Sequence, residues 1–163
     1  RPTSCHEKIW LITKSKKYYY DADAIREPVA QGTITRLSEK NLKNQKGSTR
    51  GNGGMRSNGN MKAVGNIETK NKRNVWTVTT KPCKEAHFAT FPKDLIEPCI
   101  KAGCPKGGVV FDPFGGAGTT AIVAKLLNRK SIMSELNHEY IEIAKKRIEK
   151  EFGMFEWEIY MKH

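Results

Sequence analysis

The stretch Gly108-Val-Val-Phe-Asp-Pro-Phe-Gly-Gly-Ala-Gly-Thr-Thr120 places a short apolar run directly before a glycine-rich loop. A short apolar run bounded by turn-forming residues predicts a buried β-strand. A helix is expected to follow over Thr119–Leu127. This order of strand, glycine loop and helix is typical of the nucleotide-binding half of a doubly wound α/β sheet. The spacing Gly116-x-Gly118-x-x-Ala121 matches a dinucleotide fingerprint, but the spacing alone does not identify the ligand.

Two acidic residues narrow the choice of ligand. Asp112 stands at the carboxyl end of the predicted strand, and its charge would repel a pyrophosphate. S-Adenosylmethionine carries a sulfonium and an ammonium, which a nearby carboxylate attracts. Glu135, at the tip of the next predicted strand, can accept hydrogen bonds from two ribose hydroxyls. The alternative is purely structural, with Asp112-Pro113 as a turn, Phe114 in the core and Glu135 as a helix cap.

The rest of the C-terminal half continues the α/β pattern. Pro92–Gly103 has the apolar spacing of a helix, in which Pro98 predicts a kink or a short break. Lys130–Ser134 predicts a second strand, and Asn137 is expected to cap the following helix. Phe155–Tyr160 alternates in polarity and predicts a third, parallel strand. The face of the capped helix that is expected to point inward holds Tyr140, Ile141, Ala144 and Ile148.

The N-terminal half is less regular. Lys8–Thr13 predicts a buried strand, Lys17–Asp21 is rich in strand-forming aromatic residues, and Asn74–Thr80 predicts a strand or extended segment. Between them, Gln31–Arg73 holds ten basic residues and two acidic ones, a balance of +8 within a chain of net charge +12. Its core, Gln45–Asn60, is too polar and glycine-rich to fold alone.

That basic segment can be interpreted in two ways. It can be a solvated linker, or a loop that orders on DNA, with lysine and arginine on phosphates and asparagine or arginine at base edges. The single sign of its charge favours DNA, because a linker needs flexibility but no net charge.

Composition excludes several classes of protein. No run of about 18 apolar residues predicts a membrane span, and no basic-then-apolar leader predicts secretion. The four cysteines, Cys5, Cys83, Cys99 and Cys104, show no C-x-x-C spacing, so no zinc or other metal site is predicted. Free buried thiols in a reducing, cytoplasmic compartment are the expectation.

Four segments together resemble the amino-directed DNA methyltransferases, which modify adenine at N6 or cytosine at N4. Phe111-Asp-Pro-Phe-Gly-Gly-Ala-Gly-Thr-Thr120 looks like their cofactor motif. His87-Phe-Ala-Thr-Phe-Pro-Lys-Asp-Leu-Ile96 resembles the segment before it, and Ser134-Glu-Leu-Asn-His-Glu-Tyr140 with the helix through Arg147 resembles the next motif. Arg1-Pro-Thr-Ser-Cys-His-Glu-Lys-Ile-Trp-Leu-Ile-Thr-Lys14 resembles the last motif before their target-recognition region. Their order, with recognition region before cofactor loop, is that of the circularly permuted beta class.

The resemblance implies a fold and a set of sites. The fold would be part of a Rossmann-like, S-adenosylmethionine-dependent methyltransferase sheet with an inserted, partly irregular target-recognition region. Residues 1–20 would end the catalytic subdomain, 21–80 would form the recognition region and 81–163 the cofactor-binding subdomain. The implied cofactor-binding residues are Phe88, Ala89, Thr90, Phe91, Asp112, Pro113, Phe114, Gly116, Gly118, Thr119 and Glu135. The predicted DNA-binding residues are Arg36, Lys46, Arg50, Arg56, Lys62 and Arg73.

One departure from the family pattern concerns catalysis. These enzymes carry a Pro-Pro dipeptide, flanked by Asp, Asn or Ser and an aromatic, that receives the flipped base. None of the seven prolines here is adjacent to another. The family order places that loop before Arg1, so we expect a missing N-terminal half, name no catalytic residue and expect this chain alone to be inactive. Lys8–Thr13 would then lack its usual neighbours and pair with a second copy, as in a homodimer, or in a non-native register.

Three functions therefore stay open at this point. The first is a part of a DNA methyltransferase that binds S-adenosylmethionine and double-stranded DNA with a flipped target base. The second is a non-catalytic module that holds cofactor and DNA. The third, a nicotinamide-dependent oxidoreductase, is disfavoured by Asp112 and by the charged Gln31–Arg73 segment. Whether adenine or cytosine is the target stays open as well.

Overall fold

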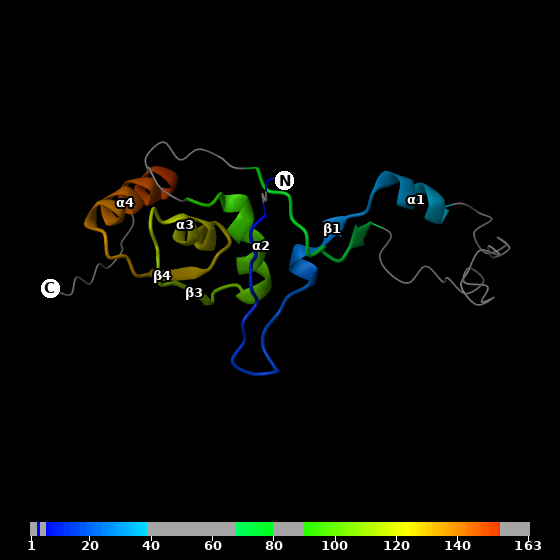
Figure 1. The fold of residues 1–163 in the computed structure, drawn as a ribbon, viewed down its shortest axis with the longest axis horizontal. Coiled ribbons are helices and arrows are strands. Elements are labelled where there is room, and N and C mark those ends of the chain that lie inside the picture. Colours follow the sequence, from blue (N-terminus) through cyan, green and yellow to red (C-terminus); the bar gives the residue numbers. More distant parts are fainter. Residues whose placement is uncertain (1–2, 4–5, 39–67, 80–89, 154–163) are drawn as a thin grey trace.

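The computed structural model describes residues 3, 6–38, 68–79 and 90–153, with only the backbone described at 36–38. In chain order the elements are a 3₁₀ turn, Asp23–Ile25, then β1 Glu27–Pro28, α1 Gln31–Ser38, β2 Thr69–Lys70, α2 Lys93–Gly103, β3 Val109–Asp112, α3 Thr119–Leu126, β4 Lys130–Met133 and α4 His138–Phe152. Figure 1 shows two parts: α2, α3 and α4 gather around β3 and β4, while β1, β2 and α1 lie to one side.

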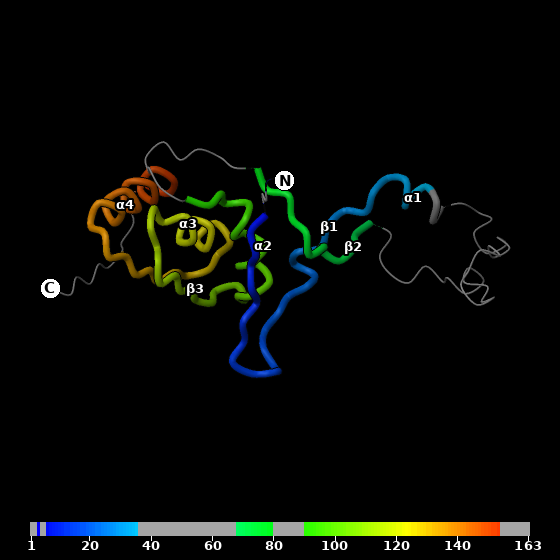
Figure 2. The backbone as a smooth tube through the Cα atoms, in the orientation of Figure 1, coloured from blue at the N-terminus to red at the C-terminus, as the bar shows by residue number. Residues whose placement is uncertain are grey.

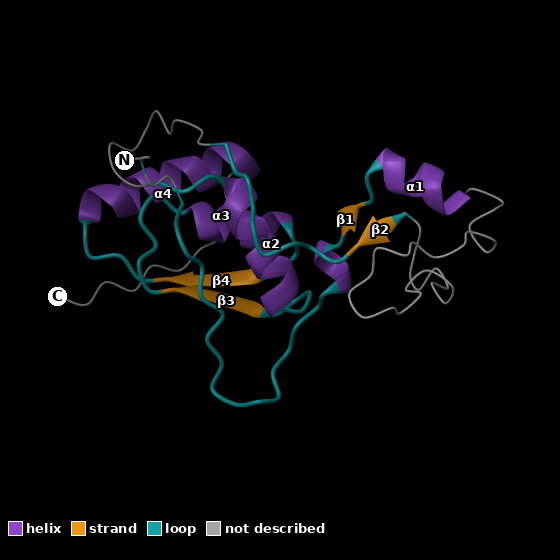
Figure 3. Ribbon diagram, turned by 45° about the vertical axis from the view of Figure 1, so that its right-hand side comes forward, coloured by secondary structure: helices purple, strands orange, loops and turns teal. Residues whose placement is uncertain are grey.

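The β3 and β4 strands pair in parallel through the crossover helix α3. Their register sets Val109 opposite Lys130 and Asp112 opposite Met133. Figure 3 shows α3 and α4 on the same side of this pair. The core lies between α2 and α3, where Ile100, Val123 and Ala124 are buried and Ile96, Val110 and Leu127 pack against them. The predicted order of helix, strand, helix, strand and helix is thereby confirmed for residues 92–152.

Helix α2 is continuous through Pro98, so the short break is wrong, while the alternative of a kink stays a prediction. Proline removes one backbone donor, here the bond to Asp94 four residues earlier, and it crowds that carbonyl. The apolar face of the helix offsets this cost, because Ile100 is buried against α3 and Ile96 packs beside it. The Cys99 thiol on the same helix donates to the Leu95 carbonyl oxygen.

Polar side chains hold the ends of the helices. Arg129 is only 8% exposed, and its Nε and Nη2 donate to the Cys104 carbonyl oxygen at 3.1 and 2.8 Å. Its Nη1 donates to the Leu127 carbonyl oxygen, so one guanidinium joins the ends of α2 and α3. Asn137 caps α4 as predicted, because its Oδ1 accepts from the Glu139 amide at 2.9 Å.

The two described cysteines are free. Cys104 is buried, as predicted, whereas Cys99 is only half-buried, and Cys5 and Cys83 lie outside the described residues. Burial raises the pKa of the Cys99 thiol, so this side chain stays protonated at neutral pH. In the described ranges no group of His, Cys, Asp and Glu is arranged to hold a metal ion, and no helix there is long and apolar enough to span a membrane.

The short antiparallel pair of β1 and β2 forms a neck at the base of the segment between these two strands. β1 and β2 pair with Glu27 opposite Lys70 and Pro28 opposite Thr69. Arg26 donates to the Thr69 side chain and carbonyl oxygen, at 2.9 and 3.0 Å, and to Asn71 Oδ1 at 2.8 Å. These contacts bring together the two ends of a segment of which residues 39–67 lie outside the described structure.

A neighbouring ion pair supports the same neck. Lys72 Nζ lies 3.0 Å from Glu27 Oε1, and the hydrogen bond from Lys72 lowers the pKa of that carboxyl below its usual value. Lys72 also sits over the Trp76 ring, 4.8 Å from its centroid. Within the region predicted to be partly irregular, residues 23–25, 27–28, 31–38 and 69–70 are regular, whereas residues 71–79 form no helix or strand.

The buried strand predicted at Lys8–Thr13 is wrong. These residues form an extended arm without assigned strand structure, visible in the tube of Figure 2. Trp10 is 71% exposed and Ile12 is 87% exposed. A strand needs a neighbour for its backbone hydrogen bonds, and none of the other described segments pairs with this one.

The other two N-terminal segments form no strand in the described residues either. At Asp21 the backbone N–H instead donates to the Ala102 carbonyl oxygen at the end of α2, at 2.9 Å. Residues 74–79 carry no strand. The third parallel strand expected at Phe155–Tyr160 lies outside the described residues.

Gly118, which precedes α3, must be glycine for two separate reasons. Its φ is +77°, and a Cβ there would lie 3.0 Å from Ala144 Cβ in α4. Gly107 shares the φ of +77° but has open space around it, whereas Gly103 at the end of α2 has neither constraint. Substituting each of the three glycines by alanine therefore distinguishes the cost of backbone strain from the cost of steric crowding.

We expect Gly118→Ala to lower the free energy of unfolding the most, by about 2–3 kcal/mol, because a left-handed residue costs about 1–2 kcal/mol and crowding adds to this cost. Gly107→Ala should cost about 1–2 kcal/mol from strain alone. Gly103→Ala should be neutral or stabilising by up to about 1 kcal/mol. Urea denaturation of the three variants measures this order, and equal losses at Gly118 and Gly107 would contradict the crowding by Ala144.

Candidate functional site

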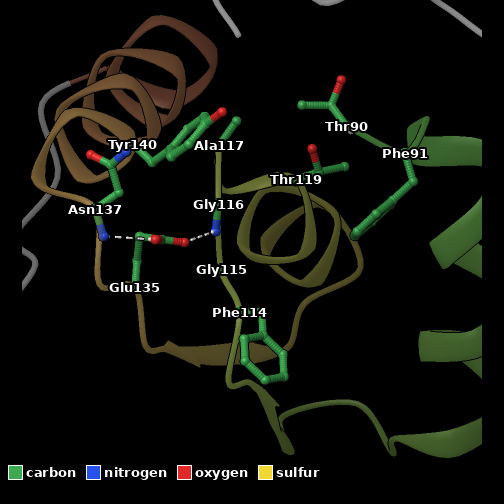
Figure 4. Close-up of a pocket in the computed structure, with 10 residues that line it drawn as sticks. All are labelled: Thr90, Phe91, Phe114, Gly115, Gly116, Ala117, Thr119, Glu135, Asn137 and Tyr140. Atoms are coloured by element: carbon green, nitrogen blue, oxygen red, sulfur yellow. Dashed lines mark hydrogen bonds between the residues drawn. The ribbon is translucent and has the colours of Figure 1, made fainter. Parts of the chain in front are cut away.

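A cavity of about 260 Å³ lies at the carboxyl edge of β3 and β4. In open α/β sheets this edge is where ligands bind. Figure 4 shows the contributing segments: the residues before α2, the loop between β3 and α3, and the start of α4. The lining residues are Thr90, Phe91, Phe114, Gly115, Gly116, Ala117, Thr119, Glu135, Asn137 and Tyr140.

The Asp112 carboxylate holds the beginning of the glycine loop through two hydrogen bonds. Its Oδ1 accepts from the Phe114 amide at 3.0 Å, and its Oδ2 accepts from Thr120 Oγ1 at 2.6 Å. The Asp112 carbonyl oxygen accepts from the Ser134 amide at 2.9 Å, which extends the ladder between the strands. The carboxylate therefore joins the end of β3 to the first turn of α3, and it does not line the cavity.

Glu135 fixes the middle of the loop from the side of β4. Its Oε2 accepts from the Gly116 amide at 2.7 Å, and its Oε1 accepts from the Asn137 amide at 2.8 Å. Figure 4 shows the carboxylate between these two amides, at the wall of the cavity. An ionised carboxylate oxygen can accept about two hydrogen bonds. Each Glu135 oxygen therefore keeps acceptor capacity for a ligand.

The cavity combines this carboxylate with exposed aromatic faces. Phe114 is 85% exposed, although the loop residues that follow it are mostly buried. Phe91 and Tyr140 contribute further ring surface to the lining. Such a set of groups suits a ligand with hydroxyl donors, a positive charge and a planar ring, because carboxylates accept hydrogen bonds and aromatic faces attract cations.

The structure gathers six of the predicted cofactor residues around the cavity. They are Thr90, Phe91, Phe114, Gly116, Thr119 and Glu135. Three others belong to the segment from the end of β3 to the start of α3 but do not line the cavity. They are Asp112, Pro113 and Gly118. Phe88 and Ala89 lie outside the described residues.

Sequence reasoning missed some members of the site. Asn137 and Tyr140 were expected only as a cap and an inward-facing helix residue, yet both line the cavity. Arg147, on the same helix, donates to the Ala117 carbonyl oxygen and to Thr119 Oγ1. The helical spacing of Asn137 and Tyr140, directly after the acid, was the signal that could have identified these two.

Of the six predicted DNA-binding residues, the structure describes the side chain of Arg73 alone, so their grouping stays a prediction. Arg73 is exposed, and its carbonyl oxygen accepts from Trp76 Nε1 at 2.6 Å. Arg36 belongs to α1, where its side chain is not described. The remaining four, Lys46, Arg50, Arg56 and Lys62, lie outside the described residues.

Curated relatives match almost the whole chain. It is 36% identical over 148 residues to the Type II methyltransferase M.SmaI of Serratia marcescens, covering 91% of this chain and 39% of that protein. It is 40% identical over 151 residues to the Type II methyltransferase M.Cfr9I of Citrobacter freundii, covering 93% of this chain and 39% of that protein. The chain thus spans about two fifths of the length of these relatives.

Solved structures match about half of the chain. The cytosine-N4-specific PvuII DNA methyltransferase is 28% identical with a TM-score of 0.43, over 47% of this chain and 31% of that chain. The M1.HpyAVI–SAM complex is 33% identical with a TM-score of 0.44, over 48% and 39% of the two chains.

A family model provides the remaining comparison. The model N6_N4_Mtase, described as DNA methylase, matches residues 1–146. This match covers every described element except the last residues of α4. It also agrees with the motif order and with the cavity at the carboxyl edge of β3 and β4. The chain therefore belongs to the N6/N4 family of DNA methylases.

Proposed function

We propose that this chain supplies the S-adenosylmethionine-binding and DNA-binding parts of a site-specific DNA methyltransferase. The methyl group would move to the exocyclic amino group of adenine (N6) or cytosine (N4). The observation that carries the proposal is the cavity at the carboxyl edge of β3 and β4, with Glu135 in its wall. Relatives named as Type II methyltransferases and a relative solved as a SAM complex support it.

The residues that line the cavity fit this cofactor chemically. Glu135 keeps acceptor capacity for ribose hydroxyls, while Phe91 and Tyr140 offer ring surface for an adenine. When bound, S-adenosylmethionine supplies a methyl group on a positively charged sulfur. Asp112, before the glycine loop, and Glu135, after β4, are both negatively charged. Their charges attract that sulfonium and the ammonium of the methionine part.

Asp112 would act mainly through the shape of the loop. Both of its carboxylate oxygens already accept hydrogen bonds, from the Phe114 amide and from Thr120 Oγ1. Loss of the carboxylate would release the first loop amide and the first turn of α3 together. We therefore infer that Asp112 and Glu135 both support cofactor binding, Asp112 from behind the loop and Glu135 from the cavity wall.

DNA binding is proposed for residues 21–80. The Gln31–Arg73 segment carries most of the net positive charge of the chain, and phosphate contacts by lysine and arginine dominate the affinity of proteins for DNA. The neck formed by β1, β2 and Arg26 returns the chain close to where it left. This pairing of β1 with β2 suits a region that is inserted into the chain and binds DNA.

The chemistry at the target base is proposed to come from residues other than these 163. Transfer requires the amino nitrogen to line up with the methyl carbon in a pocket that receives the flipped base. The family resemblance assigns that pocket to a Pro-Pro loop, and this chain contains no adjacent prolines. The second candidate function is a non-catalytic module that holds cofactor and DNA. It would use the same cavity, so only a measurement of methyl transfer distinguishes the two candidates.

Glu135→Ala and Asp112→Ala should each weaken S-adenosylmethionine binding by about 1–3 kcal/mol, the cost of losing hydrogen bonds to a charged group. Isothermal titration calorimetry on the full-length protein measures the change. Glu139→Ala is the matched control, because it removes a nearby exposed acid that does not line the cavity. Unchanged affinity in both test variants would exclude this cavity as the cofactor site.

Replacing Arg50 and Arg56 by alanine should flatten the salt dependence of DNA affinity by about one to two units of log–log slope, because each phosphate contact contributes about −0.9. Fluorescence anisotropy over a range of salt concentrations gives the slope. The control is Lys130→Ala with Lys146→Ala, two exposed lysines on β4 and α4. If both pairs change the slope equally, the effect is one of net charge, and Gln31–Arg73 is a linker.

The isolated 163-residue chain should transfer no methyl group to DNA, because positioning of the acceptor can supply several kcal/mol of the barrier. The assay incubates the chain with labelled S-adenosylmethionine and mixed-sequence DNA, beside the full-length protein. Comparable methylation by the two would show that the chain contains an acceptor-binding loop. Binding of cofactor and DNA without methylation by either would favour the non-catalytic module.

A further inference from the structure

Helix α4 lies directly against the outer side of the glycine loop. At Gly118 a Cβ would lie 3.0 Å from Ala144 Cβ and 3.7 Å from Ile148 Cδ1. Arg147 stands between these two helix residues in the sequence, so it leaves the helix beside the point of closest approach. The loop and α4 are therefore in direct contact at Gly118, a loop residue that does not line the cavity.

Arg147 bonds to two residues of the loop at once. Its Nη1 donates to the carbonyl oxygen of Ala117 and, at 3.3 Å, to Oγ1 of Thr119. Both loop residues are 5% exposed, and both line the cavity. Arg147 itself does not line it. A single guanidinium thus holds the backbone of one wall residue and the side chain of another from behind.

The loop needs such support because its glycine-rich backbone can adopt several conformations. Gly116 and Gly118 both have positive φ, at +50° and +77°, and glycine adopts other conformations at little cost. The internal bond from the Gly118 amide to the Gly115 carbonyl oxygen, at 2.9 Å, closes one turn only. Glu135 holds the Gly116 amide from the β4 side, and Arg147 holds the next residue from the α4 side.

We propose that Arg147 is a positioning residue for the cofactor, which sets the shape of the Gly116–Thr119 wall without contacting the ligand. This inference rests on the proposed function of the cavity. Without Arg147 the buried Ala117 carbonyl oxygen would lose its charged partner, and the loop could turn that oxygen elsewhere to regain one. The cavity wall would then have to be rebuilt each time the cofactor binds, which lowers affinity.

Arginine suits this position better than lysine does. The two N–H groups of Nη1 diverge from one planar, permanently charged nitrogen and reach two acceptors in a fixed geometry. A lysine could donate to one or both acceptors, but its flexible ammonium would not fix their relative positions. The conservative variant should therefore recover part of the function, and a variant without donors should recover none.

The test measures S-adenosylmethionine binding to the full-length protein and to three variants by isothermal titration calorimetry. Arg147→Met keeps an aliphatic side chain but removes both hydrogen bonds, and it should raise the Kd at least tenfold. Arg147→Lys should raise it about threefold. Lys146→Met, at an exposed position of the same helix, is the matched control and should change the Kd less than twofold.

A separate readout distinguishes positioning from general stability. In steady-state methylation, Arg147→Met should raise the KM for S-adenosylmethionine while the KM for DNA stays within twofold, because the loop does not belong to residues 21–80. A loss of folding would instead lower both functions together. Should Arg147→Met fail to fold, Thr119→Val, which deletes one of the two acceptors, should still weaken binding. In combination with Arg147→Lys its effect should be less than additive.

The possible results separate the two proposals. If the wild-type protein binds the cofactor and Arg147→Met binds it equally well, the positioning role is wrong and the proposed function stands. Equal weakening by Arg147→Met and Lys146→Met would also overturn the positioning role, since charge alone would explain it. If the wild-type protein binds no cofactor, the proposed function fails and this inference fails with it.

Discussion

The parallel pairing of β3 with β4 is the constraint on which the site depends. Parallel strands end at the same edge of a sheet, so the residues that follow Asp112 and Met133 meet there. The Ser134 amide extends the pairing by one bond to the Asp112 carbonyl oxygen. Glu135 then lies within hydrogen-bonding distance of the Gly116 amide, although 19 residues separate them in the sequence. Without this register, the acid that follows β4 would not reach the loop after β3.

The helices make that edge usable by holding the loop from outside. α3 is buried along Thr119–Ala124 and fixes where the loop ends. α4 approaches so closely that Gly118 leaves no room for a side chain. The loop between these elements is short and rich in glycine, so side chains from β3, β4 and α4 determine its shape. Acidic side chains bond its amides, and one arginine bonds its carbonyl oxygen.

One face of the β3–β4 pair has no helix over it in the described ranges. Val109, Phe111 and Ile132 are all more than half exposed on that face, while Val110 packs into the core on the other. Parallel strands are normally covered on both faces. The extended arm through Trp10 and Ile12 is equally apolar and uncovered. These surfaces mark where the described part of the chain has apolar area available for further contacts.

The sequence by itself determined the local order of the C-terminal half and six of the residues that line its cavity. Gly108–Phe111, the Thr119 helix start and the Asn137 cap are signals read within one or two turns of chain, so they required no knowledge of packing. The same local reasoning was wrong about a strand at Lys8–Thr13 and about a break in the helix at Pro98. Apolar alternation shows that a strand can be buried but not that a neighbour exists to bury it, and a proline cost can be offset by contacts such as those of Ile100 with α3.

Only the tertiary structure decided how the acids work. From the sequence, Asp112 was expected to face the ligand, yet its carboxylate bonds the loop amide of Phe114 and the hydroxyl of Thr120. Asn137 and Tyr140 line the cavity because the chain after Glu135 places the start of α4 next to the glycine loop. Arg147 reached Ala117 across 30 residues of sequence. Such contacts depend on how two elements pack against each other, and no local pattern of residue types encodes that distance or direction.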